Sequence, residues 1–247
     1  MNLSLRLQKI ADFVPEGGSV ADIGTDHAHL PIYLVQSLKN KNAIAMDVRP
    51  GPLSRAEQAI TMCRLSDKIE TRLSDGLTAL KPGEADTVVI AGMGGALIQK
   101  ILEEGRHVWD SVTDWILSPQ SEIYETRHWL EDHGFAIRKE DMVLDSGKYY
   151  VVMHVTRGAM HYTEEYEYIY GRELIQHKNP VLKAFLEQEQ RKLLLVKQRI
   201  QENLEECGRT VSEKNRKRNE IRLQEICAEA AELLRALEDI TGGKNGH

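Results

Sequence analysis

The chain has 247 residues, of which 41% are hydrophobic and 28% are charged, and its formal net charge at pH 7 is −6. This length and composition predict one main hydrophobic core with a smaller second domain. No stretch approaches the ~18 consecutive apolar residues of a membrane span, and residues 1–14 have an amphipathic helix pattern instead of a signal peptide's apolar core. We therefore expect a cytoplasmic protein with no membrane partner. Its three widely spaced cysteines argue against a zinc site or a disulfide framework.

The first predicted strand, residues 19–23, turns sharply into a helix that begins near Pro31. Such a unit opens a doubly wound sheet, in which ligands bind beyond the carboxyl ends of the strands. The turn holds Asp22, Gly24, Thr25, Asp26 and His27. A pyrophosphate-binding turn needs several glycines, whereas acidic groups repel phosphate and suit the sulfonium and ammonium groups of S-adenosylmethionine. The alternative is that Asp22 and Asp26 only cap the helix or brace the turn.

Two more acidic residues mark the carboxyl ends of the next two predicted strands: Asp47 is the last residue of 43–47, and Asp75 comes shortly after 69–73. Asp47 lies 23 positions after Gly24, close to the spacing at which an acid binds the ribose of an adenosyl ligand. Asp75 could accept a hydrogen bond from an adenine amino group. Either acid could instead cap a neighbouring turn or helix. We include the adjacent Val48 and Gly76 in the expected cofactor site.

The fourth predicted strand, residues 87–90, leads into Ala91-Gly92-Met93-Gly94-Gly95, where three glycines allow close approach of the backbone to a ligand or to another segment. We expect Ala91 and Gly92 beside the cofactor, with Gly92 and Met93 near its methyl group, and Gly95 in tight packing. A fifth strand, residues 115–117, and a hairpin of residues 136–144 and 149–155 complete the pattern. It predicts an α/β, Rossmann-like sheet with an antiparallel C-terminal hairpin.

From about residue 158 the pattern is helical, which predicts domains at 1–158 and 159–247. Tyrosines at 162, 166, 168 and 170 could pack in a core or stack on bases, and packing is the preferred interpretation. Two heptad-like helices, from Pro180 to about 206 and from about 213, predict an all-α antiparallel coiled coil. A basic cluster lies at the tip and the start of the return helix: Arg209, Lys214, Arg216, Lys217, Arg218 and Arg222. Such a cluster could bind nucleic acid or be a solvated helix face.

The order of these motifs resembles bacterial tRNA (adenine(22)-N1)-methyltransferases, which have a class I S-adenosylmethionine-dependent domain followed by a coiled coil. The resemblance covers essentially the whole chain, and its carriers are residues 21–31, 74–77 and 90–98 and the Pro119-Gln120 turn. Gly-Met-Gly-Gly replaces the Asn/Asp-Pro-Pro-aromatic motif of many methyltransferases that act on exocyclic amines. The chain departs from the family at residues 118–121, where Gln-Pro-Asn is expected, so Ser118 and Ser121 receive no role.

The resemblance implies methylation of N1 of an adenine in tRNA, with S-adenosylmethionine as donor. Asp26 is then the first candidate to stabilise the cationic product and His27 the second. The extruded base would enter a pocket lined by Gly92, Met93, Gly94, Pro119 and Gln120. The tRNA backbone would be held by Arg209, Lys214, Arg216, Lys217 and Arg218.

The remaining expectations concern metals, oligomeric state and competing functions. His27 and His29 lack a third ligand at a metal-like spacing, so we expect no metal, and we expect a monomer. Two alternatives stay open at the level of sequence. One is a methyltransferase for a small molecule or protein, with a dimerising coiled coil. The other is a non-catalytic protein that binds tRNA or senses S-adenosylmethionine.

Overall fold

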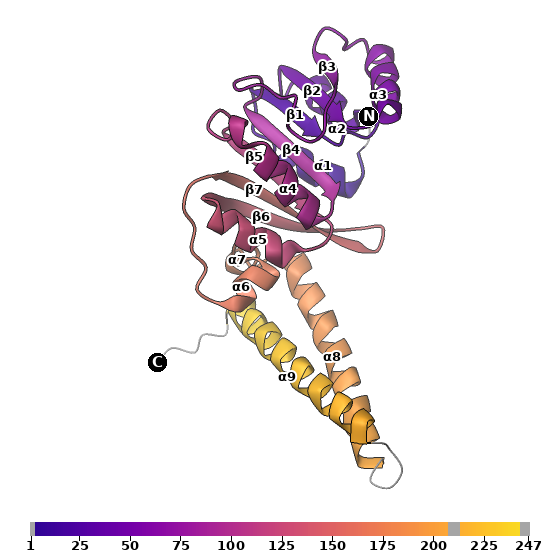
Figure 1. The fold of residues 1–247 in the computed structure, drawn as a ribbon, viewed down its shortest axis with the longest axis vertical. Helices are drawn as coiled ribbons and strands as arrows, with labels where there is room; N and C mark the ends of the chain where they lie inside the picture. The colour runs from indigo at the N-terminus through magenta and orange to yellow at the C-terminus, as the bar shows by residue number, and fades with distance from the viewer. Residues whose placement is uncertain (1–2, 207–212, 243–247) are drawn as a thin grey trace. The chain divides into compact units, whose positions relative to one another are not determined.

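The computed structural model of the protein describes residues 3–206 and 213–242. The chain divides into two compact units, Met1–His161 and Tyr162–His247, and Figure 1 shows the elements of each. The first unit contains the sheet and the helices that cover it. The described secondary-structure elements of the second unit are all helices. The boundary expected from the sequence lay after residue 158.

The first unit is built on a seven-stranded sheet with the order β3-β2-β1-β4-β5-β7-β6. Strands β1 to β5 are parallel, whereas β7 is antiparallel to both β5 and β6. The strands are β1 Ser19–Ile23, β2 Asn42–Asp47, β3 Ile69–Leu73, β4 Thr87–Met93, β5 Asp114–Pro119, β6 Phe135–Asp145 and β7 Lys148–Arg157. The predicted α/β sheet with an antiparallel C-terminal hairpin is confirmed.

The central strand β4 is apolar on both faces, as a strand covered by helices on both sides must be. Val88, Val89 and Ile90 are all fully buried. The covering helices are α1 Leu5–Phe13, α2 His29–Gln36, α3 Pro50–Met62, α4 Gly95–Glu104 and α5 Ile123–Asp132, with a short 3-10 helix at Arg106–Val108. By contrast, the edge strand β3 buries only Ile69, and its other four residues are half-buried or exposed.

Helix α1 begins where the Ser4 hydroxyl accepts a hydrogen bond of 3.3 Å from the Leu7 N–H. Its apolar face belongs to a core cluster with residues of α2 and of the central strands. The buried members of this cluster are Ile10, Ala11, Phe13, Val14, Val20, Leu30, Leu34, Val89, Ile116 and Val152. Leu3, Leu7 and Ala91 pack at its margin, so the start of α1 lies beside the carboxyl end of β4.

The second unit contains α6 Glu165–Tyr170, α7 Arg172–Gln176, α8 Pro180–Glu206 and α9 Glu213–Thr241. Helix α8 begins as predicted, because Asn179 Oδ1 accepts hydrogen bonds from the N–H groups of Val181 and Leu182. Tyr162, Tyr166 and Tyr168 are buried and Tyr170 is half-buried, which favours packing over base stacking.

Helices α8 and α9 pack against each other as an antiparallel pair (Figure 1). On α9 the predicted apolar stripe is covered, with Ile226, Leu233 and Ile240 fully buried. On α8, the heptad-like spacing of Leu193, Val196 and Ile200 predicts that Val196 faces inward, but Val196 is 44% exposed. Lys197 lies in the inward phase instead and lines a small apolar groove of about 130 Å³ between the helices. In the described part of the chain, no helix is long and apolar enough to cross a membrane.

Candidate active site

The turns that follow β1 to β5 lie along one edge of the sheet because these strands are parallel. Backbone hydrogen bonds join neighbouring turns: the N–H groups of Gly24 and Thr25 donate to Met46 O, Ser74 N–H donates to Asp47 O, and Gln120 N–H donates to Met93 O, all at 2.8–2.9 Å. The predicted cofactor and acceptor residues of the first unit therefore lie along one edge of the sheet.

Gly24, in the turn after β1 where the cofactor is expected, lies against Met93, in the turn after β4 where the acceptor is expected. Its φ is +76°, a conformation that favours glycine, and a Cβ at this position would lie 2.1 Å from Cε of Met93. The methionine from the β4 turn therefore lies directly on the turn that follows β1. A side chain at position 24 would have to displace Met93.

The backbone after Gly24 adopts an unusual shape. His27 and Ala28 have φ values of 53° and 52°, although neither is glycine, and α2 begins at His29 instead of near Pro31. Left-handed non-glycine residues cost about 1–2 kcal/mol each and are concentrated at functional sites. The turn is therefore held in a shape that local preference disfavours.

Asp22 is the most perturbed carboxyl group at the edge. Its residue is only 7% exposed, and burial raises its pKa from an ordinary 3.8 to about 6. The negative charges of Asp47 and Asp26 add to this rise, while the Thr25 hydroxyl opposes it. Such a carboxylate is poorly solvated and gains by binding a cation.

Two buried polar atoms in the segment after β1 have no hydrogen-bond partner of standard geometry among the described residues. Thr25 Oγ1 lies near enough to Asp22 to lower the pKa of that carboxyl, although it makes no hydrogen bond of standard geometry within residues 3–206 and 213–242. The buried Nδ1 of His29 likewise has no hydrogen-bond partner there. Buried polar atoms are normally paired, so these two fit contacts to the polar end of a ligand. His29 is not among the cofactor residues expected from the sequence, because no motif or spacing marks it.

Asp47 lies at the end of β2 and is also 7% exposed. Its Oδ1 accepts a hydrogen bond of 2.7 Å from the Arg49 N–H and lies 3.7 Å from Arg49 Nε. Among the described residues Oδ2 has no hydrogen-bond partner, which leaves it available to ligand hydroxyl groups. The neighbouring Val48 is 56% exposed at the same edge.

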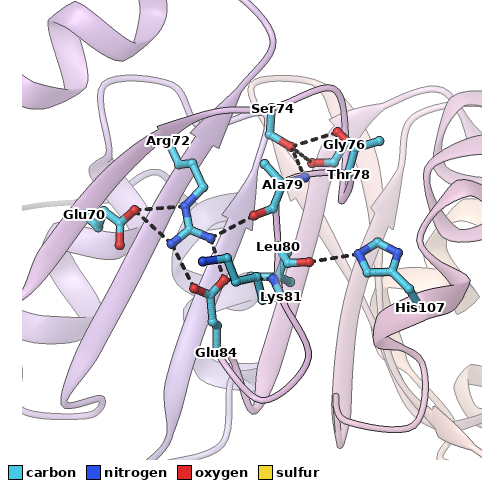
Figure 2. A network of polar contacts seen from close by, with 10 residues as sticks. All are labelled: Glu70, Arg72, Ser74, Gly76, Thr78, Ala79, Leu80, Lys81, Glu84 and His107. Carbon is cyan, nitrogen blue, oxygen red and sulfur yellow. Dashed lines mark hydrogen bonds and ion pairs between the residues drawn. The ribbon is translucent and has the colours of Figure 1, made fainter.

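The loop after β3 presents an exposed Asp75 and is held by the polar network of Figure 2. Ser74 Oγ donates to Gly76 O at 2.8 Å and accepts from the Ala79 N–H at 3.1 Å. Arg72 joins Glu70, Glu84 and Ala79 O, and His107 lies 2.8 Å from Leu80 O. A Cβ on Gly76 would lie 3.0 Å from Ile101, so this glycine is also required by packing.

Gly92 is the extra residue of a β-bulge in β4. Ala91 pairs with Ser118 and Met93 pairs with Pro119, and Gly92 between them has a φ of +80°. Pro119 is buried, whereas Gly92 and Gln120 are exposed. The bulge continues β4 three residues beyond its expected end and turns Met93 toward Gly24.

The remaining glycines of this turn begin α4. A Cβ on Gly94 would lie 3.0 Å from Ser121 Oγ, and one on Gly95 would lie 2.4 Å from Thr126 Oγ1. The Gly95 N–H donates to Glu122 Oε2 at 3.0 Å, so a carboxylate already occupies this helix N-terminus. The predicted tight packing of Gly95 is confirmed.

Asp26 and His27 lie at the rim of the site. The Asp26 side chain is 80% exposed and that of His27 is 42% exposed, with Oδ1 and Nε2 3.6 Å apart. The rings of His27 and His29 stack with centroids 5.5 Å apart. Across the described residues, no group of three or more His, Cys, Asp or Glu side chains is arranged to hold a metal ion.

The predicted basic cluster belongs to the second unit. Arg216, Lys217 and Arg218 are exposed on α9, and Arg216 Nε pairs with Glu220 at 3.1 Å. Lys214 lies on α9, but its side chain is outside the described residues, as is the whole of Arg209.

The strand order, the antiparallel β7 and the acidic residues at the carboxyl ends of β1 to β3 together define a methyltransferase fold. Residues 3–153 match the family described as "Methyltransferase domain". Among curated proteins, the Bacillus subtilis (strain 168) tRNA (adenine(22)-N(1))-methyltransferase is 40% identical over 158 residues, which is 64% of this chain and 66% of that relative. The chain belongs to the TrmK-like tRNA (m1A22) methyltransferase family, as its sequence predicted.

Solved structures cover nearly the whole chain. The Bacillus subtilis m1A22 tRNA methyltransferase TrmK is similar with a TM-score of 0.78 and 32% identity, covering 96% of this chain and 99% of that one. Streptococcus pneumoniae Sp1610, a putative tRNA (m1A22) methyltransferase in complex with S-adenosyl-L-methionine, has a TM-score of 0.80 and 32% identity, covering 96% and 100%.

Proposed function

We propose that this protein transfers a methyl group from S-adenosylmethionine to N1 of adenine 22 in tRNA. The observation that carries the proposal is the contact of Met93 with Gly24, because it joins an acidic, phosphate-excluding turn to the turn expected to receive the acceptor. The names of the relatives supply the substrate and the position. S-adenosylmethionine supplies an electrophilic methyl group on a cationic sulfur.

On the cofactor side, Asp22 holds the positive end of the donor directly or through water. Thr25 Oγ1 and His29 Nδ1 complete the contacts to its polar groups, and Asp47 Oδ2 accepts from the ribose. Asp75 accepts from the adenine amino group of the donor. Val48, Gly76, Ala91 and Gly92 shape the rest of this half of the site.

The chemistry requires alignment more than proton transfer. The N1 lone pair attacks the methyl carbon in line, the carbon–sulfur bond breaks with its electron pair left on sulfur, and the positive charge passes to the adenine. Because N1 carries no proton at neutral pH, no base is needed before attack, and the rate depends on holding the atoms about 3–3.5 Å apart. Asp26 stabilises the cationic product, with His27 as the second candidate.

The acceptor adenine must leave the tRNA stack to reach this edge. It enters beside Gly92, Met93 and Gly94, opposite Pro119 and Gln120, where backbone carbonyls accept from its amino group. The cations at the start of α9, Arg209, Lys214, Arg216, Lys217 and Arg218, bind the tRNA backbone. The protein acts as a monomer in the cytoplasm, without a metal ion.

The proposal is tested by incubating purified protein with methyl-labelled S-adenosylmethionine and tRNA from cells lacking the modification, followed by nucleoside mass spectrometry. The expected product is labelled 1-methyladenosine. A transcript in which guanosine replaces adenosine 22 should accept no label. Label in another nucleoside, or in the 22-substituted transcript, would contradict the assignment, while cofactor binding without any RNA product would favour another acceptor.

A further inference from the structure

Arg6 is a cationic residue at the acceptor half of the site that the proposed mechanism does not use. It lies in the first turn of α1, and its guanidinium reaches the β-bulge of β4. A Cβ on Gly92 would lie 3.3 Å from Arg6 Nη1 and 3.8 Å from Gln120 Nε2. The guanidinium therefore borders the space expected to receive the acceptor base.

Several contacts hold Arg6 in this place. Its backbone N–H donates to Asp145 Oδ2 at 3.1 Å, and its guanidinium carbon lies 5.1 Å from the centre of the Tyr150 ring. One turn later Lys9 pairs with Asp141 at 2.6 Å, which ties α1 to β6. The side chain is thus partly buried and oriented before any ligand arrives.

The guanidinium of Arg6 has no ion-pair partner among the described residues, although the Asp145 carboxylate that bonds its backbone N–H is near enough for the Arg6 charge to help lower the pKa of Asp145. Among the described residues, no carboxylate oxygen lies within 4.0 Å of its guanidinium, whereas Arg72 and Arg127 elsewhere in the unit are both paired with glutamates. The edge is therefore divided electrostatically. Asp22 and Asp47 lie at the carboxyl ends of β1 and β2, and Asp75 follows β3. The guanidinium lies near the ends of β4 and β5 and the start of β7.

We propose that Arg6 binds a phosphodiester of the tRNA strand that carries the target adenine, and so positions the extruded base beside Met93. A guanidinium offers a planar set of donors that matches two phosphate oxygens, and the Tyr150 ring keeps that plane in place. Arg6 is a positioning residue, since it contacts the backbone and not the reacting atoms. The inference rests on the proposed function, because it requires an RNA acceptor.

The test compares Arg6→Gln and Arg6→Lys with wild type, and uses Arg138→Gln as a matched control. Arg138 is an exposed arginine on β6 that bonds Thr156 Oγ1 and lies outside the proposed site. For each protein, kcat and KM for tRNA are measured from about 50 to 200 mM salt, a range over which phosphate contacts weaken strongly. Calorimetry gives the affinity for S-adenosylmethionine, and thermal unfolding gives Tm.

In Arg6→Gln, kcat/KM for tRNA should fall roughly 10- to 100-fold, as expected for a lost charge-assisted hydrogen bond. The slope of its logarithm against log salt should become shallower by about 0.7–0.9, corresponding to one phosphate. Arg6→Lys should restore that slope and much of the rate, because it keeps the charge. Cofactor affinity and Tm should match the Arg138→Gln control.

An unchanged salt slope in Arg6→Gln would overturn the inference, as would a selective loss of cofactor affinity, which would assign Arg6 to the donor's carboxylate. Failure of the proposed function gives a different result. In that case wild-type protein would methylate no tRNA at any salt concentration.

Discussion

At the scale of single residues, Asp22 combines two opposing properties. It is buried beside two other acids, which makes its ionised form costly, and its raised pKa of about 6 records that cost. A bound sulfonium or ammonium group would remove the cost by supplying the missing positive charge. Binding and stability should therefore respond to this residue in opposite directions.

The affinity for S-adenosylmethionine should fall as the pH is lowered through about 6, because protonation of Asp22 removes the charge that binds the donor. Below that pH the dissociation constant should rise about tenfold per unit if binding requires the carboxylate. Calorimetry from pH 7.5 to 5 measures this. Asp22→Asn should bind weakly with little pH dependence, and a flat wild-type profile would count against the carboxylate as the donor's partner.

Asp22→Asn should stabilise the free protein at pH 7. The folded-state pKa lies above the unfolded value of 3.8, so between these values the folded chain keeps a proton that the unfolded chain loses, and stability falls as pH rises. Asp22→Asn has no carboxyl group to ionise at this position, so its free energy of unfolding at pH 7 should exceed that of the wild type by at most about 3 kcal/mol. Urea denaturation of both proteins at pH 4 and pH 7 tests this, and an equal stability difference at the two pH values would show that Asp22 does not carry it.

Asp26→Asn should lower turnover more than cofactor affinity. The side chain lies at the exposed rim, so its neutral replacement keeps the shape of the turn while removing the charge opposite the cationic product. Single-turnover methylation and cofactor calorimetry on the same preparation separate the two effects. Full activity in this variant would exclude Asp26 from the chemistry and leave His27 as the candidate.

At the scale of elements, α5 is joined to β6 by a buried ion pair. Arg127 is 0% exposed and Glu140 is 5% exposed, and Glu140 Oε1 accepts from Arg127 Nε at 3.0 Å and Nη2 at 2.8 Å. A pair desolvated this fully adds little stability over a well-packed apolar pair, but either member alone is costly. It therefore fixes which segments pack together.

Arg127→Met should destabilise the protein by about 3–5 kcal/mol, because it leaves the Glu140 carboxylate buried without its cation. The double variant Arg127→Met with Glu140→Leu should regain most of that loss. Denaturant unfolding of the two variants measures the coupling between the residues. A single variant that loses less than about 1 kcal/mol would mean that Glu140 finds water or another partner.

The positions of the strands could be predicted from the sequence better than the contacts between residues that are distant in the chain. Strands β1 and β3 have the expected bounds because each is an apolar or alternating run closed by turn residues. β4 continues to Met93, past its expected end at Ile90, because the Gly92 bulge lets pairing with β5 resume. The contact of Met93 with Gly24 and the approach of Arg6 to Gly92 join positions far apart in the chain, which neither periodicity nor spacing can reveal.

At the scale of the whole molecule, the two units divide the proposed work. The sheet carries the proposed donor and acceptor sites, while α9 offers exposed cations on a protein of net charge −6. Of these, Arg216 is paired with Glu220, but exposed pairs of this kind contribute little and exchange readily for phosphate. Affinity for tRNA should thus depend on residues remote in sequence from the turns that perform the chemistry.

Replacing Arg216, Lys217 and Arg218 together with alanine should weaken tRNA binding and reduce its salt slope by about 2–3, with cofactor affinity unchanged. Filter binding across salt concentrations and calorimetry measure these quantities. Arg235→Ala is the control on the same helix, since Arg235 is an exposed cation near its far end. Unaltered tRNA affinity in the triple variant would show that these three residues form an ordinary solvated helix face that does not bind tRNA.

The network around Arg72 has a further consequence for solubility. β3 is an outer strand of the sheet, so one side of its backbone has no neighbouring strand in the described chain. An open edge of this kind can pair with the edge of another molecule and start aggregation. Glu70 and Arg72 place opposite charges on this short strand, and Arg72 is bound to Glu84. Pairing of the β3 edge with the β3 edge of a second copy would bring these charged side chains close together and remove water from them, which is unfavourable. The residues that hold the Asp75 loop therefore also oppose aggregation through this edge.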